Sequence, residues 1–199
     1  MKRQKPTKLP ITRRILILCE GESEVIYLNG YRVDKRLSGL VVEIYQPTNF
    51  SPLGLLNEAK KKIKEAKKDG LPYQSVWIVF DKDNHASIPQ TFNDAQQLNI
   101  NIAFSLISFE RWILLHFEKS ARFFLTTVDI IQYIEKNHLP NYSKTQHYAI
   151  LKPHLSMALD NAEWLHLQNS IELNNGAKPY DLQAYTDFDK LIISLENYF

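Results

Sequence analysis

Two short apolar runs in this chain each end at a cluster of carboxylates. The run at 15–19 leads into EGESE at 20–24, and the run at 76–80 leads into DKD at 81–83. Short runs without polar interruptions are typical of strands that are buried on both faces of a parallel sheet. The carboxyl ends of such strands meet at one edge, where open α/β sheets bind ligands. The sequence therefore predicts several acidic side chains at one edge of a sheet.

Carboxylates that lie close together repel one another unless a cation neutralises them, and their hard oxygens suit Mg²⁺ or Mn²⁺. Glu20 follows the first run directly, and Gly21 lets the chain turn sharply after it. If the second acidic segment is extended, Asp81 and Asp83 point to the same side, because side chains alternate along a strand. We expect Glu20, Asp81 and Asp83 to hold one or two such ions.

Each acidic motif also has a structural interpretation. Acidic residues in the first turn of a helix stabilise its dipole, which would account for the segment 20–24. The sequence Asp-Lys-Asp-Asn at 81–84 is typical of a turn. Both interpretations stay open for either motif alone, and the combination of the two motifs favours a metal site.

Strand and helix patterns alternate over the first part of the chain. Predicted strands at 15–19, 41–45, 75–80 and 100–106 are separated by predicted helices at 22–37, 53–68 and 88–98. This order predicts an α/β fold with a mostly parallel sheet that is flanked by helices. After residue 106 the pattern is helical, with expected helices at 109–117, 128–137, 156–169 and 187–198.

The expected organisation has three parts. Residues 1–12 are predicted to be a basic disordered arm, residues 13–120 the catalytic domain, and residues 121–199 a mainly helical extension packed on it. No apolar run approaches the roughly 20 residues that span a bilayer. The single cysteine, Cys19, cannot form an internal disulfide, and no signal peptide is evident. We therefore expect a cytoplasmic protein without membrane contact.

The net charge of +2 conceals an uneven distribution. Every charged residue before Glu20 is basic, and so are most of those in the helix predicted at 53–68. Such segments bind a nucleic-acid backbone without reading its sequence. A solvated helix face and a terminal tail would explain the same charges. The candidate nucleic-acid contacts are Lys60, Lys61, Lys64, Lys68 and Lys82.

Three segments carry the most specific pattern: CEGESE at 19–24, VFDKDNH at 79–85 and FERWILLHF at 109–117. Together they resemble the RloB-like family of prokaryotic defence proteins, and a weaker likeness continues through 142–144 and 185–186. The first two segments are also similar to the Toprim catalytic domain of topoisomerases, bacterial primases and overcoming-lysogenization-defect (OLD) nucleases. Where the family usually has asparagine-proline pairs, this chain has Ile107-Ser108 and Ala184-Tyr185.

The resemblance implies a Toprim-like fold and a metal-dependent nuclease that cuts DNA or RNA in antiphage or abortive-infection defence. It assigns Glu20 as the acid of the site and Asp81 and Asp83 as the metal-binding pair. By similarity to OLD nucleases, Glu24 would serve a second ion, and Glu110 would complete the site. The resemblance also implies an ATPase partner chain, since RloB-like proteins are often regarded as companions of an ATPase. This sequence has no G-x-x-x-x-G-K-[ST] loop, so any ATP-driven step would come from that other chain.

His116 and Lys144 are further possible members of the site. His116 lies in an aromatic and leucine-rich helix pattern, where a buried histidine with satisfied hydrogen bonds is an equally good interpretation. Lys144 matches a family position without an assigned role. His85 is either a substrate contact or an exposed loop residue. The alternative for the whole chain is a non-catalytic module that binds nucleic acid or an ATPase on a Toprim scaffold.

Overall fold

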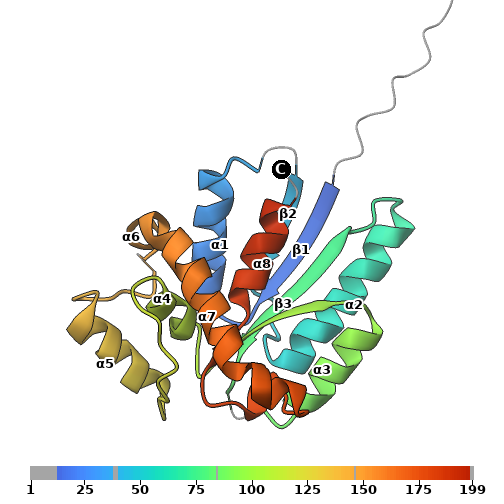
Figure 1. The fold of residues 1–199 in the computed structure, drawn as a ribbon. Helices are drawn as coiled ribbons and strands as arrows, with labels where there is room; N and C mark the ends of the chain where they lie inside the picture. The colour runs from blue at the N-terminus through green and yellow to red at the C-terminus, as the bar shows by residue number, and fades with distance from the viewer. Residues whose placement is uncertain (1–12, 38–39, 84, 146, 198–199) are drawn as a thin grey trace, which may run out of the picture.

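A five-stranded sheet lies between two layers of helices (Figure 1). The computed structural model describes residues 13–37, 40–83, 85–145 and 147–197. The predicted basic arm at 1–12 therefore lies outside the described residues. None of the helices in the described ranges is both long and apolar enough to cross a membrane.

The strand order in the sheet is β2-β1-β3-β4-β5. The first four strands are parallel, and β5 pairs antiparallel with β4. This confirms the predicted α/β class with its mostly parallel sheet. Only β5 was not predicted, because a strand of two residues leaves no periodic pattern in the sequence. The strands are β1 (Arg13–Cys19), β2 (Leu40–Tyr45), β3 (Ser75–Asp81), β4 (Asn101–Leu106) and β5 (Tyr185–Thr186).

The part of the chain after β4 is mainly helical, as predicted. The short helix α6 is an addition to the predicted set, and α7 is longer than its predicted range of 156–169. The α-helices are α1 (Glu22–Asp34), α2 (Pro52–Lys68), α3 (Ile88–Gln97), α4 (Glu110–Leu115), α5 (Thr127–Asn137), α6 (Tyr148–Leu151), α7 (Leu155–Asn174) and α8 (Phe188–Glu196). Two 3₁₀ turns, η1 and η2, span Lys152–His154 and Pro179–Asp181.

Both faces of the sheet are covered, which explains why its strands are apolar without interruption. Along β1, Leu16 and Leu18 pack into the core under α2 and α3. Ile15 and Ile17 point to the opposite face and pack with residues of α1, α4, α7 and α8. All four side chains are fully buried. The two helical layers lie on either side of the sheet in Figure 1.

Local sequence fixes where α2 begins and ends. Ser51 accepts a hydrogen bond from the Gly54 N–H, and Pro52 occupies the first turn, where its missing N–H costs nothing. At the other end, Gly70 has a φ of 70°, a conformation that glycine adopts without strain. Because β2 and β3 are parallel, α2 must start at the carboxyl edge of the sheet and return to the opposite edge.

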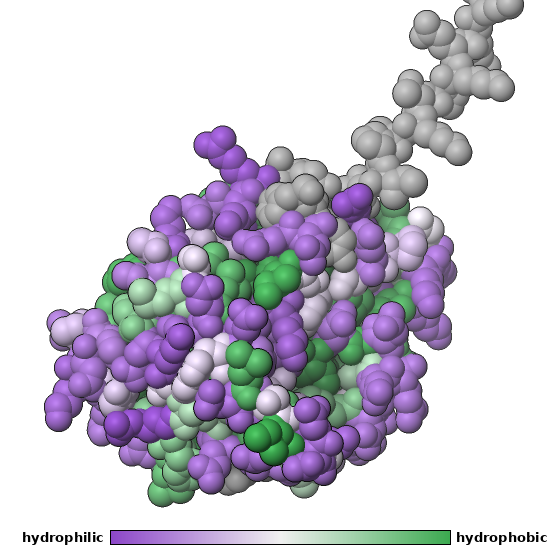
Figure 2. Space-filling view, in the orientation of Figure 1, coloured by the Kyte–Doolittle hydropathy of each residue, from purple (hydrophilic) through white to green (hydrophobic). Residues whose placement is uncertain are grey.

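Buried side-chain amides join α7 to two other segments of the chain. The Asn161 side chain in α7 donates to the Leu115 carbonyl at 2.8 Å, and the Asn169 side chain donates to the Ala184 carbonyl at 2.8 Å. On the outer side of α7, Leu167 and Ile171 are exposed. Figure 2 shows that apolar side chains on this face of the molecule are interspersed with hydrophilic ones.

We expect Asn161→Ala to lower the free energy of unfolding by about 1–3 kcal/mol, because the buried Leu115 carbonyl loses its donor. Urea unfolding followed by tryptophan fluorescence measures the change. Leu167→Ala is the matched control on the exposed side of the same helix and should change stability by less than about 0.5 kcal/mol. Equal effects of the two substitutions would contradict the packing role of Asn161.

Candidate metal centre and acidic pocket

Glu20 lies at the carboxyl edge of the sheet, one residue beyond β1. Its N–H donates to the Val79 carbonyl at 2.9 Å, and its Oε2 accepts from the Asp81 N–H at 2.9 Å. The side-chain amide of Gln46, just beyond β2, donates to the Glu20 carbonyl. These bonds hold the Glu20 carboxylate across the end of β3, because neighbouring parallel strands end at the same edge.

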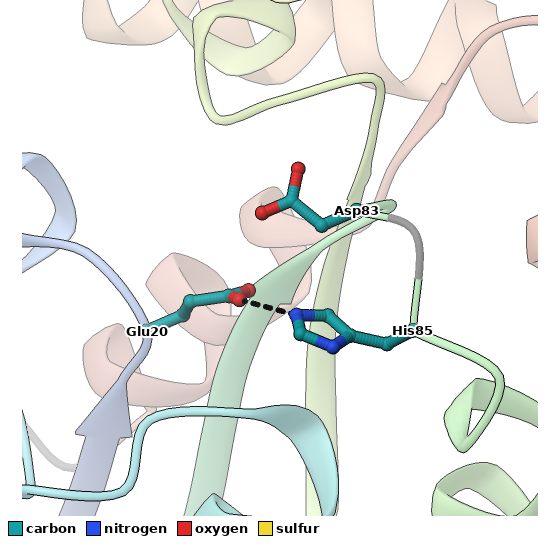
Figure 3. A group of neighbouring side chains, drawn as sticks. All are labelled: Glu20, Asp83 and His85. Atoms are coloured by element: carbon teal, nitrogen blue, oxygen red, sulfur yellow. Dashed lines mark ion pairs between the residues drawn. The ribbon is translucent and has the colours of Figure 1, made fainter.

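Three side chains converge at this edge: Glu20, Asp83 and His85 (Figure 3). One possible ligand atom from each lies within 4.8 Å of the others, and His85 Nε2 is 3.4 Å from Glu20 Oε1. Two carboxylates and a neutral imidazole can hold one divalent cation. Mg²⁺ prefers oxygen ligands, whereas transition-metal ions also accept imidazole nitrogen, so this donor set suits Mn²⁺ better than Mg²⁺. We call these three residues the metal triad.

Asp81 lies beside the metal triad but is not part of it. It is the last residue of β3, and its Oδ2 accepts a hydrogen bond from the Phe109 N–H at 2.9 Å. The prediction of a side-by-side Asp81 and Asp83 assumed that the strand continues through both residues. The strand ends between them, so His85 in the following loop completes the group with Glu20 and Asp83.

A cavity of about 300 Å³ opens next to the metal triad. Its charged lining consists of the five predicted catalytic acids, the exposed Glu22 and one lysine. The predicted acids are Glu20, Glu24, Asp81, Asp83 and Glu110, and the lysine is Lys144. We call this cavity the acidic pocket. Glu24 reaches it from the first turn of α1 and is buried. A Cβ at Gly21 would come within 2.4 Å of Glu24 Oε2, so the close approach of this carboxylate requires glycine at position 21.

Lys144 is the cationic residue among those that line the acidic pocket. Its Nζ lies 3.4 Å from Glu110 Oε1, the same oxygen that accepts a hydrogen bond from the Tyr142 hydroxyl at 3.3 Å. Glu110 is the first residue of α4 and is buried, whereas Lys144 is exposed. The arrangement fixes the Glu110 carboxylate and leaves the Lys144 ammonium accessible to an anionic ligand.

Burial makes three of these acids, Glu20, Glu24 and Asp81, hard to ionise. It raises the pKa of Glu24 to about 7, and repulsion from Glu110 and Glu20 acts in the same direction. Burial also raises the pKa of Asp81 well above its ordinary value, again with repulsion from Glu24. The pKa of Glu20 is raised chiefly by burial. The site therefore retains protons near neutral pH unless a cation takes their place.

His116 lies in the core rather than in the lining of the acidic pocket. Its Nδ1 is 2.9 Å from the Trp112 carbonyl and its Nε2 is 3.0 Å from the Tyr27 hydroxyl. Burial lowers the pKa of His116 to about 3, so the ring is neutral, with Nδ1 donating and Nε2 accepting. This arrangement corresponds to a structural histidine with both nitrogens satisfied.

The predicted nucleic-acid contacts divide into two groups. Lys60, Lys61, Lys64 and Lys68 lie along α2, where Lys61 lines a separate cavity of about 580 Å³ beyond the end of β2. Lys68 lies about 10 Å further along the helix, away from the carboxyl edge. Lys82, between the two aspartates, donates instead to the carbonyl of Tyr180 in η2.

The sequence patterns missed several polar residues of the site. Ser108, Thr127 and Thr145 line the acidic pocket, and the Ser108 hydroxyl is buried without a hydrogen-bond partner in the described part of the chain. A ligand in the pocket would be able to satisfy it. His85 had a usable signal, since it follows the D-x-D pair by two residues. Thr127 and Thr145 lie far from the acidic motifs in the sequence, and no sequence pattern pointed to them.

We expect Glu24→Gln to stabilise the metal-free protein above pH 7. The pKa of Glu24 is raised from its ordinary 4.5 to about 7, so the folded chain binds this proton more tightly than the unfolded chain. The free energy of unfolding therefore falls by up to about 3 kcal/mol as the pH rises between these two pKa values. Glutamine has no ionisable group, so the variant avoids this loss. Urea unfolding in EDTA at pH 5 and pH 8 tests this.

Glu163→Gln removes an exposed carboxylate in α7, outside the acidic pocket, and is the control for loss of a surface charge. A Glu24→Gln variant that is equally destabilised at both pH values would contradict the assignment of a raised pKa to this carboxyl.

Comparison with known proteins identifies the family. The family model described as RloB-like protein matches residues 15–195, which is nearly the whole chain. No curated protein and no solved structure matches. The match includes the metal triad, the acidic pocket and every described strand apart from the first residues of β1. The chain belongs to the RloB-like family.

Proposed function

We propose that this protein is a metal-dependent nuclease that hydrolyses phosphodiester bonds in DNA or RNA. The observation that carries the proposal is the convergence of Glu20, Asp83 and His85 within 4.8 Å at the mouth of a pocket lined by further acids. A structural acidic cluster would be expected to pair with lysine or arginine. Here Lys144 is the cation among the pocket residues, so the charge balance favours a bound metal ion.

The metal triad would hold Mn²⁺ or Mg²⁺, and Asp81 and Glu24, which line the same pocket, would serve a second ion. The ion would polarise the scissile phosphate and make a water molecule more acidic. Lys144 would offset the phosphate charge, and Glu110 keeps its ammonium group at the pocket. If a single ion binds, Glu24 in the same pocket would instead orient the attacking water.

The biological setting that we propose is prokaryotic antiphage or abortive-infection defence, with action in the cytoplasm. Family membership supports it, together with the resemblance to the OLD nucleases. The sequence contains no G-x-x-x-x-G-K-[ST] loop, so an ATP-driven step would need an ATPase partner chain.

We expect Asp83→Asn and His85→Gln each to weaken Mn²⁺ binding at least tenfold and to reduce cleavage of DNA or RNA to background, because each removes one ligand of a shared ion. Isothermal titration with Mn²⁺ and a gel assay on labelled oligonucleotides measure the two effects. Glu172→Gln, an exposed carboxylate in α7, is the matched control and should behave like wild type.

The two measurements separate the proposal from its alternatives. Mn²⁺ uptake that depends on Asp83 but is accompanied by no cleavage of any nucleic acid would indicate a metal-binding module without nuclease activity. Mn²⁺ binding that is unchanged in both variants would reject the metal triad itself.

The exposed lysines of α2 are proposed to contact the phosphate backbone. Replacing Lys61, Lys64 and Lys68 together by glutamine should reduce the slope of log binding constant against log salt by about 2, since each phosphate contact on a single strand contributes about 0.7. Fluorescence anisotropy at several salt concentrations measures the slope. Lys136→Gln, an exposed lysine in α5, should leave it unchanged. An unaltered slope in the triple variant would place the nucleic acid elsewhere.

A further inference from the structure

A second cavity adjoins the metal triad and is lined by two of its members, Asp83 and His85. It has a volume of about 520 Å³ and lies between the loop that joins β3 to α3 and the turn η2. Asp83 lines both this cavity and the acidic pocket. We call it the Tyr180 pocket, and its other lining residues are Lys82, His85, Ala86, Ile88, Pro89, Tyr180 and Asp181.

The aromatic wall of the Tyr180 pocket is held in place. The Tyr180 ring packs against the Phe92 ring with centroids 5.3 Å apart and an angle of 68°. Lys82, in the loop after β3, donates through its Nζ to the Tyr180 carbonyl. The turn η2 is thereby fastened to the end of β3, directly beside the metal triad.

The charges of the two cavities differ. In the acidic pocket, Lys144 and four residues with hydroxyl side chains line the cavity, where an anion could contact them. In the Tyr180 pocket, the Lys82 ammonium is already engaged by a carbonyl, and Asp181 adds a carboxylate to that of Asp83. Among the residues that line the Tyr180 pocket, no lysine or arginine side chain is therefore left unengaged to bind a phosphate group. A flat, uncharged group with hydrogen-bond donors fits the aromatic and apolar wall, and a nucleobase has these properties.

We propose that the Tyr180 pocket receives the base of the nucleotide next to the scissile phosphate, so that the substrate is an unpaired strand rather than an intact duplex. This inference rests on the proposed nuclease function. With the phosphate at the metal triad, the adjoining base would lie against Tyr180, Ile88 and Pro89. A base that is stacked and paired within a duplex cannot enter such a pocket without leaving its stack. Stacking on an aromatic ring is tolerant of sequence.

Binding with Ca²⁺ in place of Mn²⁺ keeps a divalent cation available to the metal triad and separates this inference from the cleavage assay. Fluorescence anisotropy with Ca²⁺ would compare a labelled single-stranded oligonucleotide, its duplex, and the same strand with abasic positions. We expect Tyr180→Ala to weaken single-strand binding at least about fivefold, as loss of one base–aromatic stack predicts, and Tyr180→Phe to stay within about twofold of wild type. Phe123→Ala removes an exposed aromatic ring outside both cavities and is the matched control.

Abasic strands test the same contact without altering the protein. Wild type should bind abasic strands at least about fivefold more weakly than the complete strand. For abasic strands, the Tyr180→Ala variant should have the same affinity as wild type, because the stacking contact is already absent. Cleavage with Mn²⁺ should be faster for single strands than for duplexes.

The outcomes distinguish the two proposals. Equal cleavage of duplex and single strand, or unchanged binding by Tyr180→Ala, would overturn the base pocket and leave the nuclease standing. Weakened binding by Tyr180→Ala together with no cleavage at any Mn²⁺ concentration would support the base pocket and overturn the nuclease. Failure of wild type both to bind and to cleave would overturn both.

Discussion

The hydrogen bond from the Asp81 N–H to the Glu20 carboxylate is the interaction on which the site depends. It belongs to a series that crosses the carboxyl edge of the sheet in strand order. Gln46 beyond β2 donates to Glu20 beyond β1, Glu20 accepts from Asp81 at the end of β3, and Asp81 accepts from Phe109 beyond β4. Glu20 and Asp81 thus also align the strand ends, so the positions of these two acids are set by the sheet.

This double role has an electrostatic cost. Hydrogen bonds from backbone N–H groups favour the ionised carboxylates of Glu20 and Asp81, yet burial outweighs them and raises the pKa of both groups. Glu24 adds repulsion from within the same pocket. The structure therefore holds a charge arrangement that is unfavourable without a counter-ion. Functional sites commonly accept such a local loss of stability, which is made up by packing elsewhere in the fold.

Local sequence patterns were sufficient to predict the elements whose formation depends on residues that are close together in the sequence. The continuous apolar runs predicted β1 and β3, and the parallel arrangement brought Glu20 and Asp83 to one edge. The place of His85 depends on how the chain leaves the end of β3, which no periodicity encodes. The pair of Glu110 with Lys144 joins segments that are adjacent only through tertiary packing. The hydrophobic periodicities that identify strands and helices carry no information on such tertiary contacts.

The two sides of the metal triad are chemically unlike, and this asymmetry limits how a polymer can lie across it. On one side are buried acids with an accessible ammonium group, and on the other an aromatic wall fixed by Lys82. In the proposed nuclease, the charged backbone and the bases of a strand would favour opposite sides. A bound strand would then have a preferred direction without any contact that reads its sequence. The direction of the bound strand would follow from the order of β1, β3 and η2 along the carboxyl edge of the sheet, and the fold sets this order.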